Sequence, residues 1–406
     1  MKITERPYYA KKLAGVMGTP DIKVITGVRG CGKTTLLEWY MQYIADNVPD
    51  ANIIHINFEL EQSAPLKEYH ALHDFVESSH KNGCSNFVFI DEVQMCPKFE
   101  LAVNSLHASE KYDICITGSN AFLLSSDLAT LLTGRTFAIS VFPFSFAEFR
   151  NLLKAEDLNA SLDRYIEAGG MPGASLSHEQ DARHQYVCDL FETLLARDIR
   201  QKHNIRKTAV LDKIAGYMAD NFTRQISADN ITAMLADSGH KTGLKTVSRY
   251  MEYLCQAFAL YKIRRYDIGG KNYLGSDARY YLGDHSFFHA GPGTKNTDLA
   301  QCGRVLENIV AIDLLRRGYE VCYGVLHQKE IVFVAMRRNE KMYILMSDNI
   351  CDEKTFMRDA GYLLDIRDAY PKVILARTRH PRCQYEGIQI IDIADWLCQD
   401  NVYPMR

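Results

Sequence analysis

Short apolar runs alternate with amphipathic segments along the first third of the chain. Continuous apolar runs rich in β-branched residues predict buried strands, which we expect at 22–26, 52–57, 87–90, 113–117 and 136–141. Helices are expected between them, at 33–46, 65–81 and 119–132. Buried strands that alternate with helices are typical of a parallel sheet covered on both faces. This part of the sequence therefore predicts an α/β domain with a parallel sheet.

The pattern changes after residue 143. The strand signal disappears as far as about residue 204, and two or three helices are expected around a tight turn at 169–173. Residues 206–285 predict three helices and then a hairpin, with strands at 259–266 and 271–282. After a stretch around Pro292 and Gly293 with the composition of a linker, residues 300–406 predict helices at 303–317 and 353–364 and strands at 331–335, 342–346 and 372–376. The predicted domains are 1–142, 143–205, 206–285 and 298–406.

Composition places the chain among globular proteins. Of the 406 residues, 47% are apolar and 24% are charged, which is ordinary for folded domains and excludes disorder as the main state. No apolar run approaches the roughly 18 residues of a membrane-spanning helix, and the first residues are charged where a signal peptide would be apolar. The 11 cysteines form no CxxC pair. We therefore expect reduced thiols, a cytoplasmic location and no membrane partner.

The charge is unevenly distributed along the chain. The net charge is −3, but residues 206–285 hold 12 basic and 8 acidic side chains, a net of +4. Residues 1–143 hold 12 basic and 16 acidic side chains, a net of −4. The third segment is therefore the place where contact with nucleic acid is expected.

A glycine-rich sequence follows the first predicted strand. Residues 27–34 read GVRGCGKT, which fits the phosphate-loop pattern GxxxxGK[ST] between a strand and a helix. Glycines let backbone amides surround a phosphate, and the next helix presents its positive end to the anion. Lys33 is expected to reach the β- and γ-phosphates, and Thr34 to ligate Mg²⁺. The residues predicted to bind ATP are Gly27, Arg29, Gly30, Cys31, Gly32, Lys33, Thr34 and Thr35.

An acidic pair ends the third predicted strand. Asp91 and Glu92 follow the apolar run FVFI, and ligands of parallel sheets bind where strands end. We expect Asp91 to hold the Mg²⁺ shell and Glu92 to orient the attacking water; the alternative is an acidic helix cap. The strand at 52–57 lies between the two motifs, and Glu92 adjoins Asp91. Both features are typical of ATPases rather than small-molecule kinases or GTPases, so they favour hydrolysis.

Two further residues are candidates for the catalytic site. The fourth predicted strand ends in TGSN, and Asn120 is expected to contact the γ-phosphate or the water. The alternative is a helix N-cap, where Ser and Asn are favoured. Arg135 is a candidate arginine finger, acting in its own chain or in a neighbour within a homo-oligomer. The alternatives are a surface role for Arg135 and a finger role for Arg29.

The ordered motifs resemble a known family. GVRGCGKT, FVFIDEVQ, ITGSNAFLL, LLTGR, VFPFSFAEF and GGMPG are followed by LLARDI, GRVLENIVAIDLLRRGYEV and KEIVFVA. This series resembles the bacterial and archaeal AAA-like P-loop ATPases with a C-terminal domain of unknown function, a group near the signal-transduction ATPases with numerous domains. The resemblance spans nearly the whole chain. It implies a P-loop ATPase domain, a winged-helix-like domain and a C-terminal α/β domain related to restriction endonucleases.

Residues 206–285 agree with a winged helix. A first helix is expected at 227–237 and a second, at 242–256, would be the recognition helix. The predicted contacts with duplex DNA come from the start of that helix and from the hairpin: Lys241, Lys245, Arg249, Arg264 and Arg265. The alternative is a module that contacts a protein partner and no DNA.

The last segment invites a nuclease interpretation. Glu307 lies in the helix where such folds carry a glutamate, and family members commonly read EIDFV at the next strand. Here residues 330–334 read EIVFV, so Val332 replaces the aspartate. Valine cannot ligate Mg²⁺, which needs oxygen ligands. We therefore expect a degenerate nuclease-like domain without nuclease activity.

The sequence as a whole favours an ATP-hydrolysing molecular switch that requires Mg²⁺. The γ-phosphate would bias how the domains dock. Two alternatives remain at this stage. One is an ATP-dependent nuclease or DNA-processing enzyme. The other is a DNA-binding regulator that holds ATP without hydrolysing it.

Overall fold

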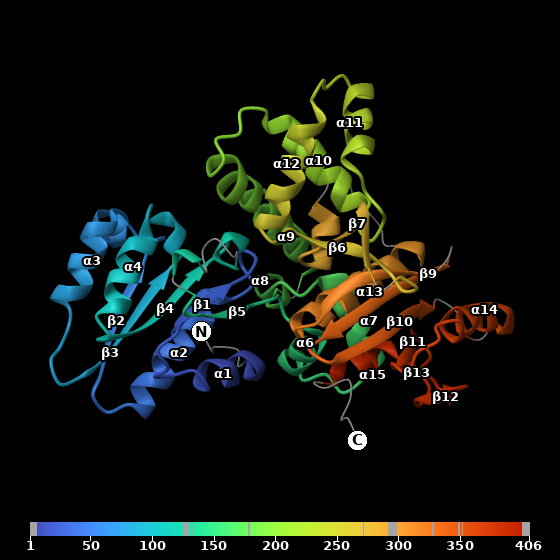
Figure 1. Cartoon of the computed structure of the whole chain (residues 1–406), viewed down its shortest axis with the longest axis horizontal. Coiled ribbons are helices and arrows are strands. Elements are labelled where there is room, and N and C mark those ends of the chain that lie inside the picture. The colour runs from blue at the N-terminus through green and yellow to red at the C-terminus, as the bar shows by residue number, and fades with distance from the viewer. Residues whose placement is uncertain are drawn as a thin grey trace. The chain divides into compact units, whose positions relative to one another are not determined.

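The computed structural model divides the chain into two compact units (Figure 1). It describes residues 6–124, 130–132, 134–177, 179–270, 272–290, 299–326, 329–347, 350 and 352–399. The first unit comprises residues 1–142 with 256–258, and the second comprises residues 143–255 with 259–406. Within the part of the chain described, no helix combines the length and apolar character that crossing a membrane requires.

The first unit contains the predicted parallel sheet. Its strands are β1 (Ile22–Thr26), β2 (Ala51–Asn57), β3 (Ser85–Asp91), β4 (Tyr112–Gly118) and β5 (Thr136–Ser140). They pair in parallel in the order β2-β3-β4-β1-β5. The strand pattern of the sequence is confirmed for all five. Because β4 lies between β1 and β3, the residues that follow these three strands meet at one edge of the sheet.

Helices cover both faces of this sheet. The helix α2 (Lys33–Asn47) packs on one face, where Tyr40 contacts Phe89 edge to face. The opposite face is covered by α3 (Tyr69–Ser78) and α4 (Phe99–Ala108), whose apolar residues join those of the strands in one core. The pattern did not predict α1 (Pro7–Ala14).

Two predicted helices of the first unit differ from the structure. The helix expected at 65–81 is a 3-10 turn, η1 (Glu61–Lys67), followed by α3. The break occurs because Glu68 caps α3, with its carboxylate accepting from the amides of His70 and Ala71. The helix expected at 119–132 starts as the short 3-10 turn η3 (Ala121–Leu124), and residues 125–129 lie outside the described residues. Another short turn, η2 (Val93–Met95), follows β3.

The second unit begins with helices and contains a large mixed sheet. The helices before it are α6 (Phe146–Leu153), α7 (Leu158–Ala168), α8 (Pro172–Ser175), α9 (Gln180–Thr193), the π-helix η4 (Leu194–Gln201), α10 (Thr208–Asp220), α11 (Ala228–Asp237) and α12 (Leu244–Gln256). The strands are β6 (Leu260–Asp267), β7 (Asn272–Leu282), β8 (Glu320–Leu326), β9 (Lys329–Arg337), β10 (Glu340–Ser347), β11 (Lys372–Ala376), β12 (Cys383–Tyr385) and β13 (Ile388–Asp392). They are arranged as β12-β13-β11-β10-β9-β8-β6-β7. The remaining elements are η5 (His285–Ala290), α13 (Leu299–Arg316), α14 (Glu353–Leu364) and α15 (Ile393–Cys398).

The predicted hairpin belongs to this large sheet. β6 and β7 pair antiparallel, as expected, but β6 also pairs in parallel with β8, where Arg264 lies opposite Cys322. The sequence pattern predicted 206–285 and 298–406 as separate domains. In the structure, strands from both ranges belong to one sheet. An isolated hairpin leaves backbone groups unpaired at its edges, and β8, which the pattern missed, satisfies those of β6. The strands β12 and β13 and the helix α15 were also missed.

A buried carboxylate and a backbone hydrogen bond together join three segments of the second unit. The amides of Gly170 and Ser286 both donate to Asp284 at 2.9 Å. Phe144 donates from its amide to the carbonyl of Gly170 at 2.7 Å. A Cβ atom at Gly170 would lie 2.5 Å from the Phe144 oxygen. The close approach of these backbones explains why this turn needs glycine.

We expect Asp284→Ala to lower the unfolding free energy of the second unit by about 2–4 kcal/mol, because it leaves buried amides without an acceptor. The measurement is urea unfolding monitored by the fluorescence of buried Trp396, in a Trp39→Phe background that removes the other tryptophan. The exposed Glu167→Ala is the matched control, with an expected change within about 0.5 kcal/mol. A similar small change for Asp284→Ala would contradict this account.

Candidate phosphate-binding site

The loop between β1 and α2 has a backbone that only glycines fit. Gly32, which precedes the first residue of α2, adopts a left-handed conformation with φ 97°, which is unfavourable for residues with a Cβ atom. Gly27 lies so close to the end of β5 that its Cβ would be 2.0 Å from the Val141 oxygen. Both glycines of the predicted motif are therefore required by the geometry of the loop.

The Lys33 side chain folds back over this loop. Its ammonium donates to the carbonyl of Gly27 at 3.1 Å and to that of Val28 at 3.4 Å. It also lies 3.5 Å from Oε1 of Glu92, and both side chains are buried. A buried ammonium at the first turn of a helix adds a full positive charge to the helix dipole, so the loop is suited to an anion such as a phosphate.

Two hydroxyls hold the carboxylate of Asp91. The Thr34 hydroxyl donates to Oδ2 at 2.8 Å, and the Thr117 hydroxyl donates to Oδ1. These side chains come from α2, β4 and β3, and Asp91 is buried. A hydroxyl beside a carboxylate is a donor set that fits Mg²⁺, which takes one or two protein oxygens and completes its shell with water and substrate phosphates. Over the described ranges, no group of three or more His, Cys, Asp or Glu residues could hold a metal alone.

Glu92 is fixed by its backbone and its side chain. Its backbone is left-handed, with φ 53°, and its amide donates to the Thr117 hydroxyl at 3.0 Å. The Ser119 hydroxyl donates to Oε2 at 3.1 Å, and the Gln94 amide donates to the same oxygen. These contacts aim the carboxylate toward the loop, where Lys33 faces its other oxygen.

The environment keeps Glu92 ionised. Burial by itself would raise the pKa of this carboxyl, but the Lys33 ammonium and the Gln94 hydrogen bond outweigh it, and the pKa lies below its ordinary value. Glu92 therefore has the charge that a group needs to orient a water molecule and accept its proton.

The end of β4 contributes through residues other than the one predicted. Thr117 contacts both acidic residues, and Ser119 contacts Glu92. Asn120, the predicted residue, uses its side-chain oxygen to accept from the Phe122 amide at 2.7 Å. It therefore caps the turn η3, as the alternative interpretation stated. Gln94, two residues after the acidic pair, was missed, because its role depends on how β3 and β4 lie together.

Of the two candidate arginines, one lies in the loop and the other lies far from it. Arg135 precedes β5, and its carbonyl accepts from the Ile22 amide at 2.9 Å. This is the edge of the sheet opposite to the loop, roughly 15 Å away at the usual rise along a strand, so Arg135 does not reach the loop of its own chain. Arg29 is in the loop and pairs with Glu59 at 2.9 Å. Of the other predicted loop residues, Cys31 is buried, and burial raises the pKa of its thiol, whereas Gly30 and Thr35 are exposed.

In the second unit, most of the predicted basic residues are exposed. Lys241, Lys245 and Arg249 lie on or just before α12, with Arg264 on β6. Arg265, the next residue along the strand, is only partly exposed. A register irregularity between Arg264 and Tyr266 changes the local geometry.

An arginine lies between two acidic residues of the segment that was predicted to resemble a nuclease. The Arg279 guanidinium is 3.8 Å from Glu307 and 2.5 Å from Glu330. Tyr281 also donates its hydroxyl to Glu307 at 2.7 Å. Val332 supplies no ligand atom. These residues do not fit a divalent metal, which argues against the alternative of a metal-dependent nuclease.

Comparison with known proteins identifies two matching domain families. Residues 19–150 match a family model described as an AAA domain, and residues 159–298 match a domain of unknown function, DUF8612. An uncharacterized protein of Haemophilus influenzae is 33% identical over 400 residues, which cover 97% of this chain and 98% of that protein. The uncharacterized protein MJ1544 of Methanocaldococcus jannaschii is 27% identical over 342 residues, covering 81% of this chain and 73% of that protein.

Among solved structures, the Walker-type ATPase PABY2304 of Pyrococcus abyssi is similar to 71% of this chain and 95% of its own. Its sequence identity is 16% and its TM-score is 0.46. A TM-score of this size is too low for the likeness to indicate a shared function.

The lowered pKa of Glu92 predicts a pH-dependent contribution to stability. A carboxyl with a depressed pKa stabilises the folded state above its unfolded pKa, and this contribution is lost as the pH falls through the folded value. We expect wild type to unfold at a higher temperature than Glu92→Gln at pH 7, and the gap to shrink below about pH 4, since the ordinary value is about 4.3.

Calorimetry of the first unit's transition at both pH values measures this gap. Glu38→Gln, which alters an exposed carboxylate on α2, is the control and should match wild type. An equal gap at both pH values would show that the ionised carboxylate does not stabilise the site.

Proposed function

This chain belongs to the family of bacterial and archaeal AAA-like P-loop ATPases in which a domain of unknown function follows the ATPase domain, and from that membership we propose that it is an ATP-hydrolysing molecular switch. The nucleotide at the loop would bias how the two units dock. The observation that carries the proposal is the convergence of Lys33, Asp91 and Glu92 at one edge of the sheet.

Each of these residues has a separate task. The loop amides and Lys33 hold the β- and γ-phosphates. Thr34 and Asp91 hold Mg²⁺, which neutralises phosphate charge when bound. Glu92 orients the attacking water and accepts its proton. Ser119 and Gln94 occupy its Oε2, which leaves Oε1, the oxygen facing Lys33, to contact the water.

The arrangement also makes the site sensitive to the γ-phosphate. Lys33 pairs with Glu92 at 3.5 Å, and a phosphate near Lys33 would compete for the same ammonium. Thr117 contacts the carboxylate of Asp91 and the backbone amide of Glu92, and Ser119 contacts the carboxylate of Glu92. A change at either carboxylate is therefore transmitted to the end of β4, and η3 begins three residues after the strand ends.

We expect Lys33→Ala to abolish binding of a fluorescent ATP analogue, because it removes the charge that faces the phosphates. Glu92→Gln should keep nucleotide binding and lower phosphate release by about 10²-fold or more, the usual contribution of a general base. Binding is measured by fluorescence titration and turnover by phosphate release with Mg²⁺. The control is again Glu38→Gln, which should hydrolyse ATP as wild type does.

The outcomes separate the proposal from its rival. Unchanged nucleotide binding by Lys33→Ala would overturn the proposal. ATP binding by wild type with no phosphate release under any condition would favour the regulator that holds ATP without turnover.

A second proposal concerns duplex DNA and rests on the exposed basic residues of α12. The helices α10, α11 and α12 precede the hairpin, and the segment before α11 pairs with β7, where the Thr223 amide donates to the Tyr280 carbonyl at 2.8 Å. We infer a winged helix with α12 as its recognition helix. Its exposed Lys241, Lys245 and Arg249 would contact backbone phosphates.

The charge reversals Lys245→Glu and Arg249→Glu test this second proposal. Each should weaken binding to a duplex of about 20 base pairs regardless of its sequence, and lower the salt dependence by about one phosphate contact. Fluorescence anisotropy at 50 and 200 mM salt measures both effects. Lys354→Glu, exposed on α14, is the control. No duplex binding by wild type would overturn the DNA proposal and favour a protein partner for this surface.

A further inference from the structure

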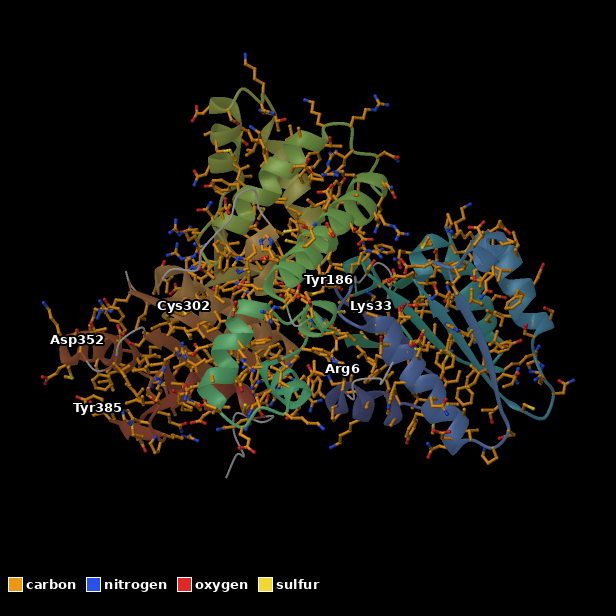
Figure 2. The ribbon with its side chains drawn as sticks, turned by 180° about the vertical axis from the view of Figure 1, so that it is seen from behind. Arg6, Lys33, Tyr186, Cys302, Asp352 and Tyr385 are labelled. Atoms are coloured by element: carbon orange, nitrogen blue, oxygen red, sulfur yellow. The ribbon has the colours of Figure 1, made fainter. Side chains whose placement is uncertain are left out.

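Arg6 connects the phosphate loop to the end of the first unit. It is buried immediately before α1, with 6% of its surface exposed. One guanidinium nitrogen, Nη1, donates to the carbonyl of Cys31 at 3.0 Å, and the other, Nη2, donates to the carbonyl of Phe142 at 2.8 Å. Figure 2 labels Arg6 and Lys33, each of which donates to a carbonyl of the loop. One planar group therefore spans two segments that are more than a hundred residues apart in sequence.

The segment at Val141 and Phe142 is held to the loop at further points. The Val141 amide donates to the Thr26 carbonyl at 2.6 Å, at the start of the loop. The Phe142 amide donates to the hydroxyl of Tyr9 at 3.1 Å, and the Arg6 guanidinium lies 4.5 Å from the centre of the same tyrosine ring. Tyr9 is fully buried. Loop and segment are thus held together at the beginning and near the end of the loop.

We propose that Arg6 is a positioning residue that couples the phosphate loop to Phe142, the last residue of the first unit before the chain enters the second. The inference rests on the proposed function, because it assigns the route by which nucleotide at the loop acts on the connection between the units. Arg6 is not one of the residues of the loop motif, which spans 27–34.

The chemistry of arginine explains why this position suits it. A guanidinium is planar and presents donors in a fixed fork, so it holds two carbonyls at a set spacing, which a lysine ammonium does not. The Cys31 carbonyl and the Gly32 amide belong to the same peptide group. A charged donor on that carbonyl polarises the peptide and strengthens its amide as a donor to an anion. Arg6 thus acts on phosphate binding through the loop.

The coupling predicts that nucleotide protects two segments together. We expect saturating ADP or a non-hydrolysable ATP analogue with Mg²⁺ to slow hydrogen exchange in peptides covering 27–34 and 139–146 of wild type. In Arg6→Gln, nucleotide should still protect 27–34 at saturation, but protection at 139–146 should fall by at least half. The nucleotide Kd should rise by about tenfold, since a charged donor to the loop is lost.

Arg6→Lys separates a positioning role from a merely structural one. It keeps the positive charge, so its nucleotide Kd should stay within about threefold of wild type, while protection at 139–146 is lost with the fork. Lys11→Ala, which alters an exposed residue on α1, is the matched control and should behave as wild type. If Arg6→Gln does not fold, the measurements on Arg6→Lys alone test the inference.

Two results would overturn the inference while leaving the proposed function intact. One is nucleotide protection of 27–34 in wild type without any at 139–146. The other is wild-type protection at 139–146 in both Arg6 variants. Failure of wild type to bind nucleotide at all would overturn the inference and the proposed function together.

Discussion

A buried ammonium facing a buried carboxylate organises the first unit. Burying either charge alone is costly, and Lys33 and Glu92 compensate one another at the edge of the sheet. The same pairing explains the neighbouring contacts, because Gln94 and Ser119 satisfy the carboxylate oxygen that Lys33 does not face. A phosphate that engages Lys33 removes part of this compensation. Binding of a phosphate in the loop would therefore weaken the contact between Lys33 and Glu92.

The features that the sequence predicted well are local. The phosphate loop is defined by glycines and a lysine within eight residues, and the acidic pair ends an apolar strand. Each motif can therefore be recognised from one short stretch of sequence. The contacts that were missed depend on packing between distant segments. Ser119 was not distinguished from Asn120, although one contacts Glu92 and the other caps a turn. Arg6 lies 25 residues before the carbonyl that it contacts in the loop.

The same limit explains the domain boundaries. Periodicity identified β6 and β7 as a hairpin and the following segment as a separate α/β domain. It could not show that β8 would pair with β6, because a strand pattern contains no information about its neighbour. Since β8 follows α13 with only a short turn, the helical pattern also concealed the strand. One continuous sheet therefore includes both the hairpin and the last predicted domain.

The distribution of charge in the two units separates their roles. In the first unit, buried acidic groups face an ammonium and hydroxyls at the end of a sheet, an arrangement that phosphate and Mg²⁺ can enter. In the second, Glu307 and Glu330 already face the Arg279 guanidinium, and Val332 stands where the resemblance implied an aspartate. A guanidinium cannot be deprotonated at neutral pH. Its permanent positive charge therefore disfavours a metal ion beside the same carboxylates. We therefore expect chemistry from the first unit alone.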